Sequence, residues 1–256
     1  MLPILIDFDG VVKLDNKPSP DADGFLKFLT ANKIPSCIIS NSTLRTGDLI
    51  KEFFSSHGIE LEIPALTAFD ATLAFVKKQY KRVQVYCRDY LKHHFEGMID
   101  EENPEVIVVG DIENRWNYEI VNDIFKKVFN GAKLIAMHKN KYWSPHGELL
   151  IDAGAFVKAI EYSSGKEAVL IGKPSPIYFQ SALERIGYPA NSKFIMIGDD
   201  IETDIAGAQS CGGKGILIYT GKTKYPLKED IKLKPDFEAM NLVEVMDIVK
   251  RITLRN

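Results

Sequence analysis

Cysteine is scarce in this sequence, which argues against a small fold stabilised by disulfides or by a metal ion bound to cysteines. The three cysteines, Cys37, Cys87 and Cys211, are widely spaced and odd in number. They match neither a disulfide framework nor a CxxC metal motif. We therefore expect a protein of a reducing compartment, and the cytoplasm is the predicted location.

Long apolar runs and an excess of charge of one sign are lacking too. No apolar run approaches the roughly 20 residues that a membrane-spanning helix needs. The first expected strand begins almost at Met1, so the sequence predicts no signal peptide. The chain has 32 Lys and Arg residues against 35 Asp and Glu residues, a formal net charge of -3. This balance favours neither nucleic acid nor an acidic membrane surface as a partner.

The chain does have a regular alternation of strand and helix patterns. Short apolar runs typical of buried strands are ILIDFDG, IPSCIISNS, AVLIG, KFIMIGDD and GILIYTG. Segments with helical spacing of apolar residues separate them, such as SPIYFQSALERIG. Continuous apolar strands divided by helices predict an α/β fold, a Rossmann-like, doubly wound parallel sheet.

The middle of the chain repeats this alternation on a smaller scale. Residues 68–168 contain their own strand and helix patterns, and about 100 residues are enough for a separate hydrophobic core. The segments with catalytic character lie on either side. The sequence therefore predicts an inserted α/β domain at 68–168, within a core domain made of residues 1–67 and 169–256.

The first strand ends in two carboxylates, Asp7 and Asp9, followed by Gly10. Ligands of open α/β sheets bind at the carboxyl ends of the strands. Strand alternation turns Phe8 away from both aspartates, so both carboxylates can approach one site. Close carboxylates repel each other unless a cation lies between them or they share a proton. The alternative is a plain surface turn, in which Asp and Gly are common.

Two further strand ends carry residues suited to phosphate. Ser40 ends the run CIIS, and Asn41 and Ser42 follow it and lead into a helix, where hydroxyl and amide groups bind phosphate oxygens well. The same residues also make ordinary helix caps. Lys173 follows AVLI, and Pro174 favours an extended backbone there. Its ammonium group can balance negative charge, although a solvated loop lysine is the alternative.

The strand KFIMI ends in Asp199 and Asp200, and Asp204 lies four residues beyond. Such oxygen-rich groups suit Mg²⁺, which binds through one or two carboxylates and keeps several waters. Acidic residues at a helix N-terminus are the alternative, because they interact favourably with the helix dipole. All four strand ends, expected in one sheet, supply the groups needed for phosphoryl transfer through an aspartyl phosphate.

In order and spacing, the segments DFDGVV, ISNST, GKPSP and IGDDIETDIAGAQSCG resemble the four motifs of the haloacid dehalogenase superfamily. The insertion between the second and third motifs resembles the cap of its NagD-like, type IIA phosphatases. Within that subfamily the chain is most similar to the phospholysine phosphohistidine inorganic pyrophosphate phosphatase group. Three residues depart from the common pattern: Ser40 for threonine, Ser42 for asparagine, and Lys13 for an aromatic residue.

The resemblance implies a role for each matching residue. Asp7 would attack phosphorus, and Asp9 would protonate the leaving oxygen and then activate water. Mg²⁺ would bind the Asp7 carboxylate, the Asp9 main-chain carbonyl and Asp199. Lys173 would offset negative charge, supported by Asp204 or Asp200.

The resemblance also implies what the enzyme binds. Ser40, Asn41 and Ser42, with Gly10, would surround the phosphoryl group of a small phosphorylated metabolite or of pyrophosphate. Arg115, in the inserted loop GDIENRWNY, is a candidate substrate contact, or else a solvated charge. A homodimer formed through the cap is a further possibility.

Other functions remain open at this point. A phosphomutase of the same superfamily would return the phosphoryl group to substrate instead of passing it to water. A binding protein could keep the scaffold without catalysis, although the complete set of acids and lysine disfavours this. A dehalogenase would need neither Asp9 nor the metal acids. A dehydrogenase is disfavoured because no GxGxxG follows the first strand.

Overall fold

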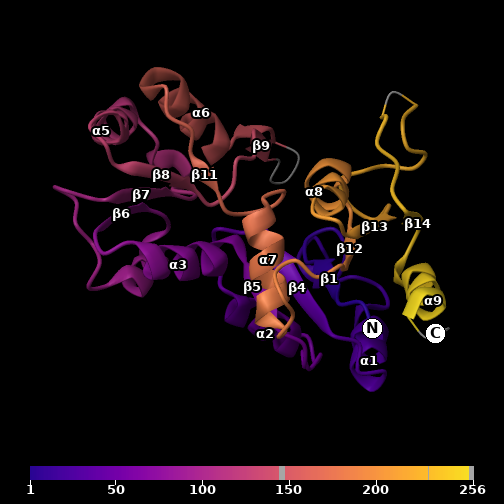
Figure 1. Ribbon diagram of the computed structural model, residues 1–256. Coiled ribbons are helices and arrows are strands. Elements are labelled where there is room, and N and C mark those ends of the chain that lie inside the picture. Colours follow the sequence, from indigo (N-terminus) through magenta and orange to yellow (C-terminus); the bar gives the residue numbers. More distant parts are fainter. Residues whose placement is uncertain (144–147, 230, 254–256) are drawn as a thin grey trace. The chain divides into compact units, whose positions relative to one another are not determined.

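The computed structural model describes residues 1–143, 148–229 and 231–253 (Figure 1). Its contacts divide the chain into two compact units. The core unit contains Met1–Ser40, Gly47–Leu66 and Lys173–Asn256, and the inserted unit contains Asn41–Thr46 and Thr67–Gly172. The predicted domain limits, 1–67 with 169–256 and 68–168, stay a prediction.

The core unit is built on a six-stranded sheet. Its order is β14 (Phe237–Ala239), β13 (Lys214–Ile218), β12 (Ile195–Gly198), β1 (Ile4–Asp7), β4 (Ser36–Ser40) and β5 (Ala65–Thr67). The strand pairs from β14 to β4 are parallel, and Ile4 of β1 lies between Ile195 and Ser36. A short antiparallel hairpin, β2 (Lys13–Leu14) and β3 (Lys17–Pro18), follows β1. The predicted α/β class with a parallel core sheet is confirmed.

Helices cover both faces of this sheet because its side chains alternate. Ile216 and Ile218 join the hydrophobic cluster that contains residues of α1 (Ala22–Ala31), α2 (Gly47–Ser56) and α9 (Leu242–Thr253). Leu217, between them, packs instead with Ile201 and Ile205 of the π-helix η4 (Ile201–Ala206). The helices α7 (Pro176–Arg185) and α8 (Gly207–Ser210) complete the core unit. The strands are buried on both faces, which explains their continuous apolar runs.

The inserted unit has its own four-stranded parallel sheet. The order is β11 (Val169–Leu170), β8 (Lys133–Ala136), β7 (Val106–Val109) and β6 (Val83–Tyr86). The helices α5 (Tyr118–Phe129) and α6 (Ala153–Ser164) pack on one face, with α3 (Ala68–Gln79) on the other (Figure 1). Smaller elements are α4 (Asp89–Lys92), the 3₁₀ turns His93–Phe95 and Glu113–Arg115, and the hairpin of β9 (Tyr142–Trp143) with β10 (Leu150–Ile151).

One strand lies in a different sheet from the one the sequence predicts. The run AVLIG was expected beside KFIMIGDD and GILIYTG, but β11 pairs with β8 of the inserted unit. The expectation that all four motif-bearing strands share one sheet is therefore wrong. A strand with only two paired residues does not reveal in the sequence which strand it will pair with, because a short apolar strand fits the edge of either sheet. Lys173 follows three residues later, where the core unit resumes.

The start of the helix α3 is determined by the residue that precedes it. Ala65–Thr67 forms β5, and Thr67 then caps the helix. The Thr67 hydroxyl accepts a hydrogen bond from the Asp70 main-chain N–H, and Asp70 accepts one from the Thr67 N–H. This capping box satisfies two donors at the helix N-terminus and fixes where the helix starts.

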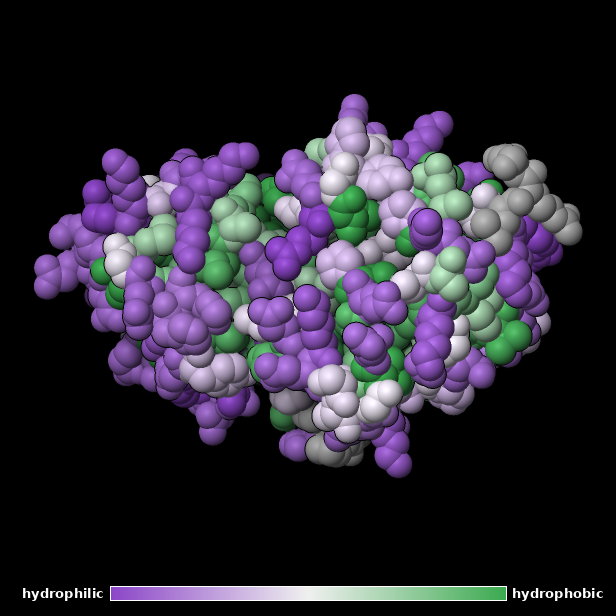
Figure 2. Space-filling view, turned by 90° about the horizontal axis from the view of Figure 1, so that it is seen from below, coloured by the Kyte–Doolittle hydropathy of each residue, from purple (hydrophilic) through white to green (hydrophobic). Residues whose placement is uncertain are grey.

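Hydrophilic residues cover most of the face shown in Figure 2, with hydrophobic residues in small patches among them. Throughout the described part of the chain, every helix is too short or too polar to cross a membrane.

Candidate active site

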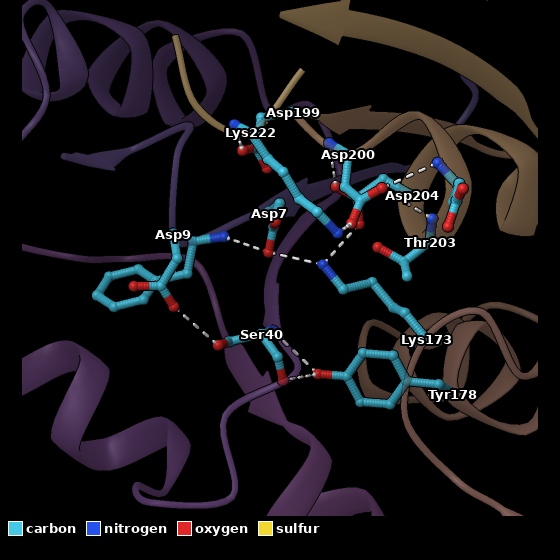
Figure 3. Close-up of polar contacts among 12 residues, drawn as sticks. Asp7, Asp9, Ser40, Lys173, Tyr178, Asp199, Asp200, Thr203, Asp204 and Lys222 are labelled. Atoms are coloured by element: carbon cyan, nitrogen blue, oxygen red, sulfur yellow. Dashed lines mark hydrogen bonds and ion pairs between the residues drawn. The ribbon is translucent and has the colours of Figure 1, made fainter. Parts of the chain in front are cut away.

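The carboxyl end of β1 separates the two aspartates of the first motif. Phe8 turns into the core, where its ring packs against Phe53 and Phe54 at centroid distances of 5.4 and 5.9 Å. Asp7 is buried, whereas the Asp9 side chain is 53% exposed. The Asp9 carboxylate faces Ser40, whose Oγ lies 3.3 Å away (Figure 3). Its other oxygen lies 2.7 Å from the Lys13 ammonium. The two carboxylates thus point to different partners.

Lys173 lies between two buried carboxylates. Its Nζ is 2.7 Å from Asp7 Oδ1 and 2.6 Å from Asp204 Oδ1 (Figure 3). Burial lowers the pKa of Lys173, but Asp204 and Asp7 outweigh this and raise the pKa above its usual range. Burial raises the pKa of Asp7, Asp204 and Asp199 raise it further, and Lys173 acts in the opposite direction. The ammonium group is therefore firmly protonated and shared by both acids.

A third buried acid completes this group. Oxygen atoms of Asp7, Asp199 and Asp204 all lie within 4.8 Å of one another. Burial, and then Asp204, raise the pKa of Asp199 to about 6. Three carboxylates against one ammonium leave an excess of negative charge in a buried place, so a divalent cation with oxygen ligands fits the residues present. The Asp9 carboxylate is outside this group, and Asp204, expected only as a supporting residue, is inside it.

Two glycines make the close packing of these acids possible. A Cβ atom on Gly10 would lie 2.3 Å from Asp199 Oδ2, and Gly10 has a φ of +84°. A Cβ atom on Gly198 would lie 2.4 Å from Asp204 Oδ2. A side chain at either position would push a carboxylate away from the group.

Asp200 acts on the helix that carries Asp204. Its carboxylate accepts hydrogen bonds from the main-chain N–H groups of Glu202 and Thr203, at the start of η4. The Asp200 N–H in turn donates to Asp204 Oδ2 at 3.2 Å. Burial raises the pKa of Asp200, but the charge and hydrogen bond of Lys222, together with the hydrogen bonds from Glu202 and Thr203, outweigh burial and lower the pKa. The contacts of Asp200 are therefore those of an acidic residue that caps a helix N-terminus, which is the alternative that the sequence offered for this motif.

The loop after β13 also reaches the acids, and the sequence did not single it out. The Lys222 N–H donates to Asp199 Oδ2, and its ammonium pairs with Asp200, each at 2.5 Å. The Thr220 hydroxyl donates to the Gly10 carbonyl at 2.5 Å. The run GILIYTG ends in small polar residues, so the strand-end rule that found the other motifs applies here too.

Tyr178 of α7 was also not identified from the sequence, for a different reason. Its buried hydroxyl accepts a hydrogen bond from the Ser40 N–H and lies 2.6 Å from the Ser40 carbonyl and 2.8 Å from that of Leu66. It thereby fixes the end of β4, where Ser40 turns toward Asp9 (Figure 3). In sequence, a tyrosine on the apolar face of a helix resembles any core residue.

Three predicted phosphate or substrate contacts belong to the inserted unit. Asn41 and Ser42 lie in its segment Asn41–Thr46, where the Ser42 hydroxyl accepts a hydrogen bond from the Leu44 N–H at 3.2 Å. Arg115 pairs with Asp89 at 2.9 Å and donates to the Cys87 carbonyl at 3.0 Å. Their roles toward a substrate stay predictions.

Two family models match the sequence. One, described as haloacid dehalogenase-like hydrolase, matches residues 4–98, and one described as HAD-hydrolase-like matches residues 170–245. The human haloacid dehalogenase-like hydrolase domain-containing protein 2 is 30% identical over 233 residues, which are 91% of this chain and 88% of that protein. The mouse phospholysine phosphohistidine inorganic pyrophosphate phosphatase is 33% identical over 72% of this chain and 68% of that protein.

Solved structures agree with these matches. A 4-nitrophenylphosphatase from Thermotoga maritima has a TM-score of 0.86 and 27% identity, covering 96% of this chain and 97% of that one. NagD from Escherichia coli has a TM-score of 0.84 and 25% identity, covering 95% and 98%. The chain belongs to the haloacid dehalogenase-like hydrolases, as a phosphatase of their NagD-like branch.

Proposed function

We propose that this phosphatase hydrolyses a small phosphorylated molecule with Mg²⁺, through an aspartyl phosphate on Asp7. The observation that carries the proposal is the buried group formed by Asp7, Lys173, Asp199 and Asp204 at the carboxyl ends of parallel strands. The names of relatives support the reaction class, since they include 4-nitrophenylphosphatase and pyrophosphate phosphatase. A phosphorylated metabolite and pyrophosphate are both candidate substrates.

Asp7 has the surroundings of a nucleophile. Among the described residues, its hydrogen bonds go to one oxygen: Oδ1 accepts from the Phe8 N–H at 2.8 Å and from Lys173 at 2.7 Å. The other oxygen is left for phosphorus. Burial disfavours the ionised carboxylate, and Lys173 counteracts this by stabilising the charged form that attack requires.

Asp7 and Asp199, with the main-chain carbonyl of Asp9, would hold the Mg²⁺ ion, and Asp204 would orient Lys173 beside it. When bound, the ion would offset the repulsion between the Asp7 carboxylate and an incoming phosphate. Ser40, Asn41, Ser42 and the backbone near Gly10 would receive the phosphoryl oxygens.

Asp9 is suited to proton transfer because it is the exposed member of the pair. Its carboxylate lies outside the buried acid group, where a leaving oxygen and water can reach it. It would donate a proton as the ester bond breaks and take one from water when the aspartyl phosphate is hydrolysed. A cytoplasmic location, expected from the scarcity and wide spacing of cysteine in the sequence, is part of this proposal.

The first test is release of phosphate from p-nitrophenyl phosphate, with Mg²⁺ and with EDTA. We expect Mg²⁺-dependent turnover in the wild type and none in Asp7→Asn. Asp23→Asn changes an exposed acid on α1 and serves as the matched control. Equal activity in Asp7→Asn would show that the nucleophile is a different residue.

A second experiment identifies the fate of the phosphoryl group. Free phosphate in stoichiometric yield with alcohol supports hydrolysis, whereas an isomerised substrate without free phosphate would support a phosphomutase. A folded wild type that acts on neither p-nitrophenyl phosphate nor a panel of phosphorylated metabolites and pyrophosphate would contradict the enzyme proposal.

A further inference from the structure

The Asp9 carboxylate is held from two sides. Lys13 Nζ lies 2.7 Å from Asp9 Oδ1, and the Ser40 hydroxyl lies 3.3 Å from Oδ2. The contact with Lys13 is the shorter of the two and joins full charges. Lys13 is therefore the main partner that determines where this carboxylate points.

Lys13 differs from an ordinary surface lysine. Its side chain is only 13% exposed, whereas that of Asp9 is 53% exposed. Its backbone is fixed by two hydrogen bonds: the Lys13 N–H donates to the Phe8 carbonyl at 2.9 Å, and the Gly10 N–H donates to the Lys13 carbonyl at 2.8 Å. The ammonium also lies 5.6 Å from the centre of the Phe8 ring. Little side-chain freedom is left to lose, so this pair can orient its acid better than most exposed pairs.

The buried acid group favours the same position of Asp9. Its three carboxylates, with the single ammonium of Lys173, leave an excess of negative charge that repels the Asp9 carboxylate. The Lys13 ammonium attracts this carboxylate on the exposed side, so both effects keep it outside the buried group.

We infer that Lys13 is a positioning residue that holds the Asp9 carboxyl group toward the leaving oxygen of the substrate. The inference rests on the proposed function. In the first step, an Asp7 oxygen bonds to phosphorus, the bond from phosphorus to the leaving oxygen breaks, and that oxygen takes the proton of Asp9. In the second step, water bonds to phosphorus and gives a proton to Asp9, while the bond between Asp7 and phosphorus breaks and releases phosphate.

Leaving groups of different quality test this inference. An alkyl phosphate such as glycerol 2-phosphate needs a proton donor, because an alkoxide is a poor leaving group, whereas p-nitrophenolate departs without one. The measured quantity is the ratio of kcat/KM for the alkyl ester to kcat/KM for p-nitrophenyl phosphate. This ratio reports only the steps up to cleavage of the ester bond.

In Lys13→Met we expect this ratio to fall by roughly tenfold, part of the 10²–10⁴-fold that a general acid contributes. Asp9→Asn should lower the ratio further, and Lys13→Arg, which keeps the charge, should restore most of it. Lys27→Met is the matched control, because Lys27 pairs with Asp23 at the same 2.7 Å distance and spacing on α1. Its ratio should equal that of the wild type.

Two results would overturn the inference. One is an unchanged ratio in folded Lys13→Met. The other is an equal rise in KM for both esters, which would mean that Lys13 binds the phosphate directly. If the wild type were itself inactive, or Asp7→Asn were active, the proposed function would fail instead, so the two failures are distinguishable.

Discussion

Tyr178 connects two strand ends of the core unit through a single hydroxyl group. The hydroxyl is buried and bonds to the backbone of Ser40 and Leu66. In Tyr178→Phe these backbone groups lose their partner, so we expect unfolding in urea to require about 1–3 kcal/mol less free energy. Tyr188→Phe, at a hydroxyl 3.4 Å from the Met1 carbonyl, should cost much less. Equal losses in both variants would contradict the assigned role.

Gly10 offers a second test at the scale of one residue. An alanine at this position would place a Cβ atom against Asp199 and would have to adopt a φ of +84°, which residues with a side chain rarely do. We expect Gly10→Ala to need roughly tenfold more Mg²⁺ for half-maximal activity, because a displaced ligand weakens a metal site. Gly24→Ala, where nothing lies within 4 Å of the new Cβ atom, is the control and should need no more Mg²⁺ than the wild type. A Mg²⁺ titration of phosphate release decides between these outcomes.

Sequence reasoning located the residues whose chemistry is unusual for their place, such as Asp7 and Asp199 at the ends of apolar strands. It could not locate Tyr178, because Ser40 lies 138 positions away and no local pattern links them. It also could not predict that the Asp9 carboxylate pairs with Lys13 and lies outside the buried acid group, because the direction of a side chain at a turn depends on tertiary contacts. The roles of these residues in catalysis stay predictions.

At the scale of elements, the order of strands and helices was predictable and the assignment of one strand was not. The apolar patterns of β1, β4, β12 and β13 agree with the structure, because strands that are buried on both faces appear in the sequence as continuous apolar runs. The strand β11 has two residues, and its partner is determined by the exposed edge of β8. Such an edge exists only after the inserted sheet has formed.

The Glu161 side chain connects α6 to Ala168, the residue that precedes β11. Its buried carboxylate accepts from Lys139 at 2.5 Å, from Lys158 at 3.2 Å and from the Ala168 N–H at 2.8 Å. Burial raises its pKa, but the hydrogen bond from Lys139 and the other contacts outweigh burial and lower the pKa below the ordinary 4.5. The carboxylate therefore stabilises the fold above pH 4.5, and this contribution is lost as the pH falls through its lowered pKa.

We expect Glu161→Gln to lower the free energy of unfolding by about 1–3 kcal/mol at pH 7 and by progressively less below pH 4.5. Denaturant unfolding at several pH values measures the difference from the wild type. Glu119→Gln, in the first turn of α5, is a control for loss of an acid on a helix of the same unit. A difference that stays constant with pH would mean that the charge of Glu161 is not involved.

At the scale of the whole molecule, the buried acids should make stability depend on Mg²⁺. Burial and Asp204 raise the pKa of Asp199 to about 6, so its ionisation opposes folding near pH 8. We expect Mg²⁺ at about a hundredfold excess over its Kd to raise the melting temperature of the wild type by about 5–10 °C. In Asp199→Asn the melting temperature in EDTA should be higher than that of the wild type, and its response to Mg²⁺ smaller. Thermal scans with Mg²⁺ and with EDTA test both, and an equal response in the two proteins would contradict the metal assignment.

The pairing of β1 with β12 has a consequence for the order in which a ribosome makes this chain. Ile4 pairs with Ser36 on one side, which follows soon after, but with Ile195 on the other. At translation rates of about 5–20 residues per second, that second edge of β1 stays open for roughly 10–40 seconds. An open apolar strand edge invites pairing with other nascent chains. Placing the inserted unit between β4 and β12 lengthens this interval, so we expect the protein to depend on chaperones until β12 has emerged.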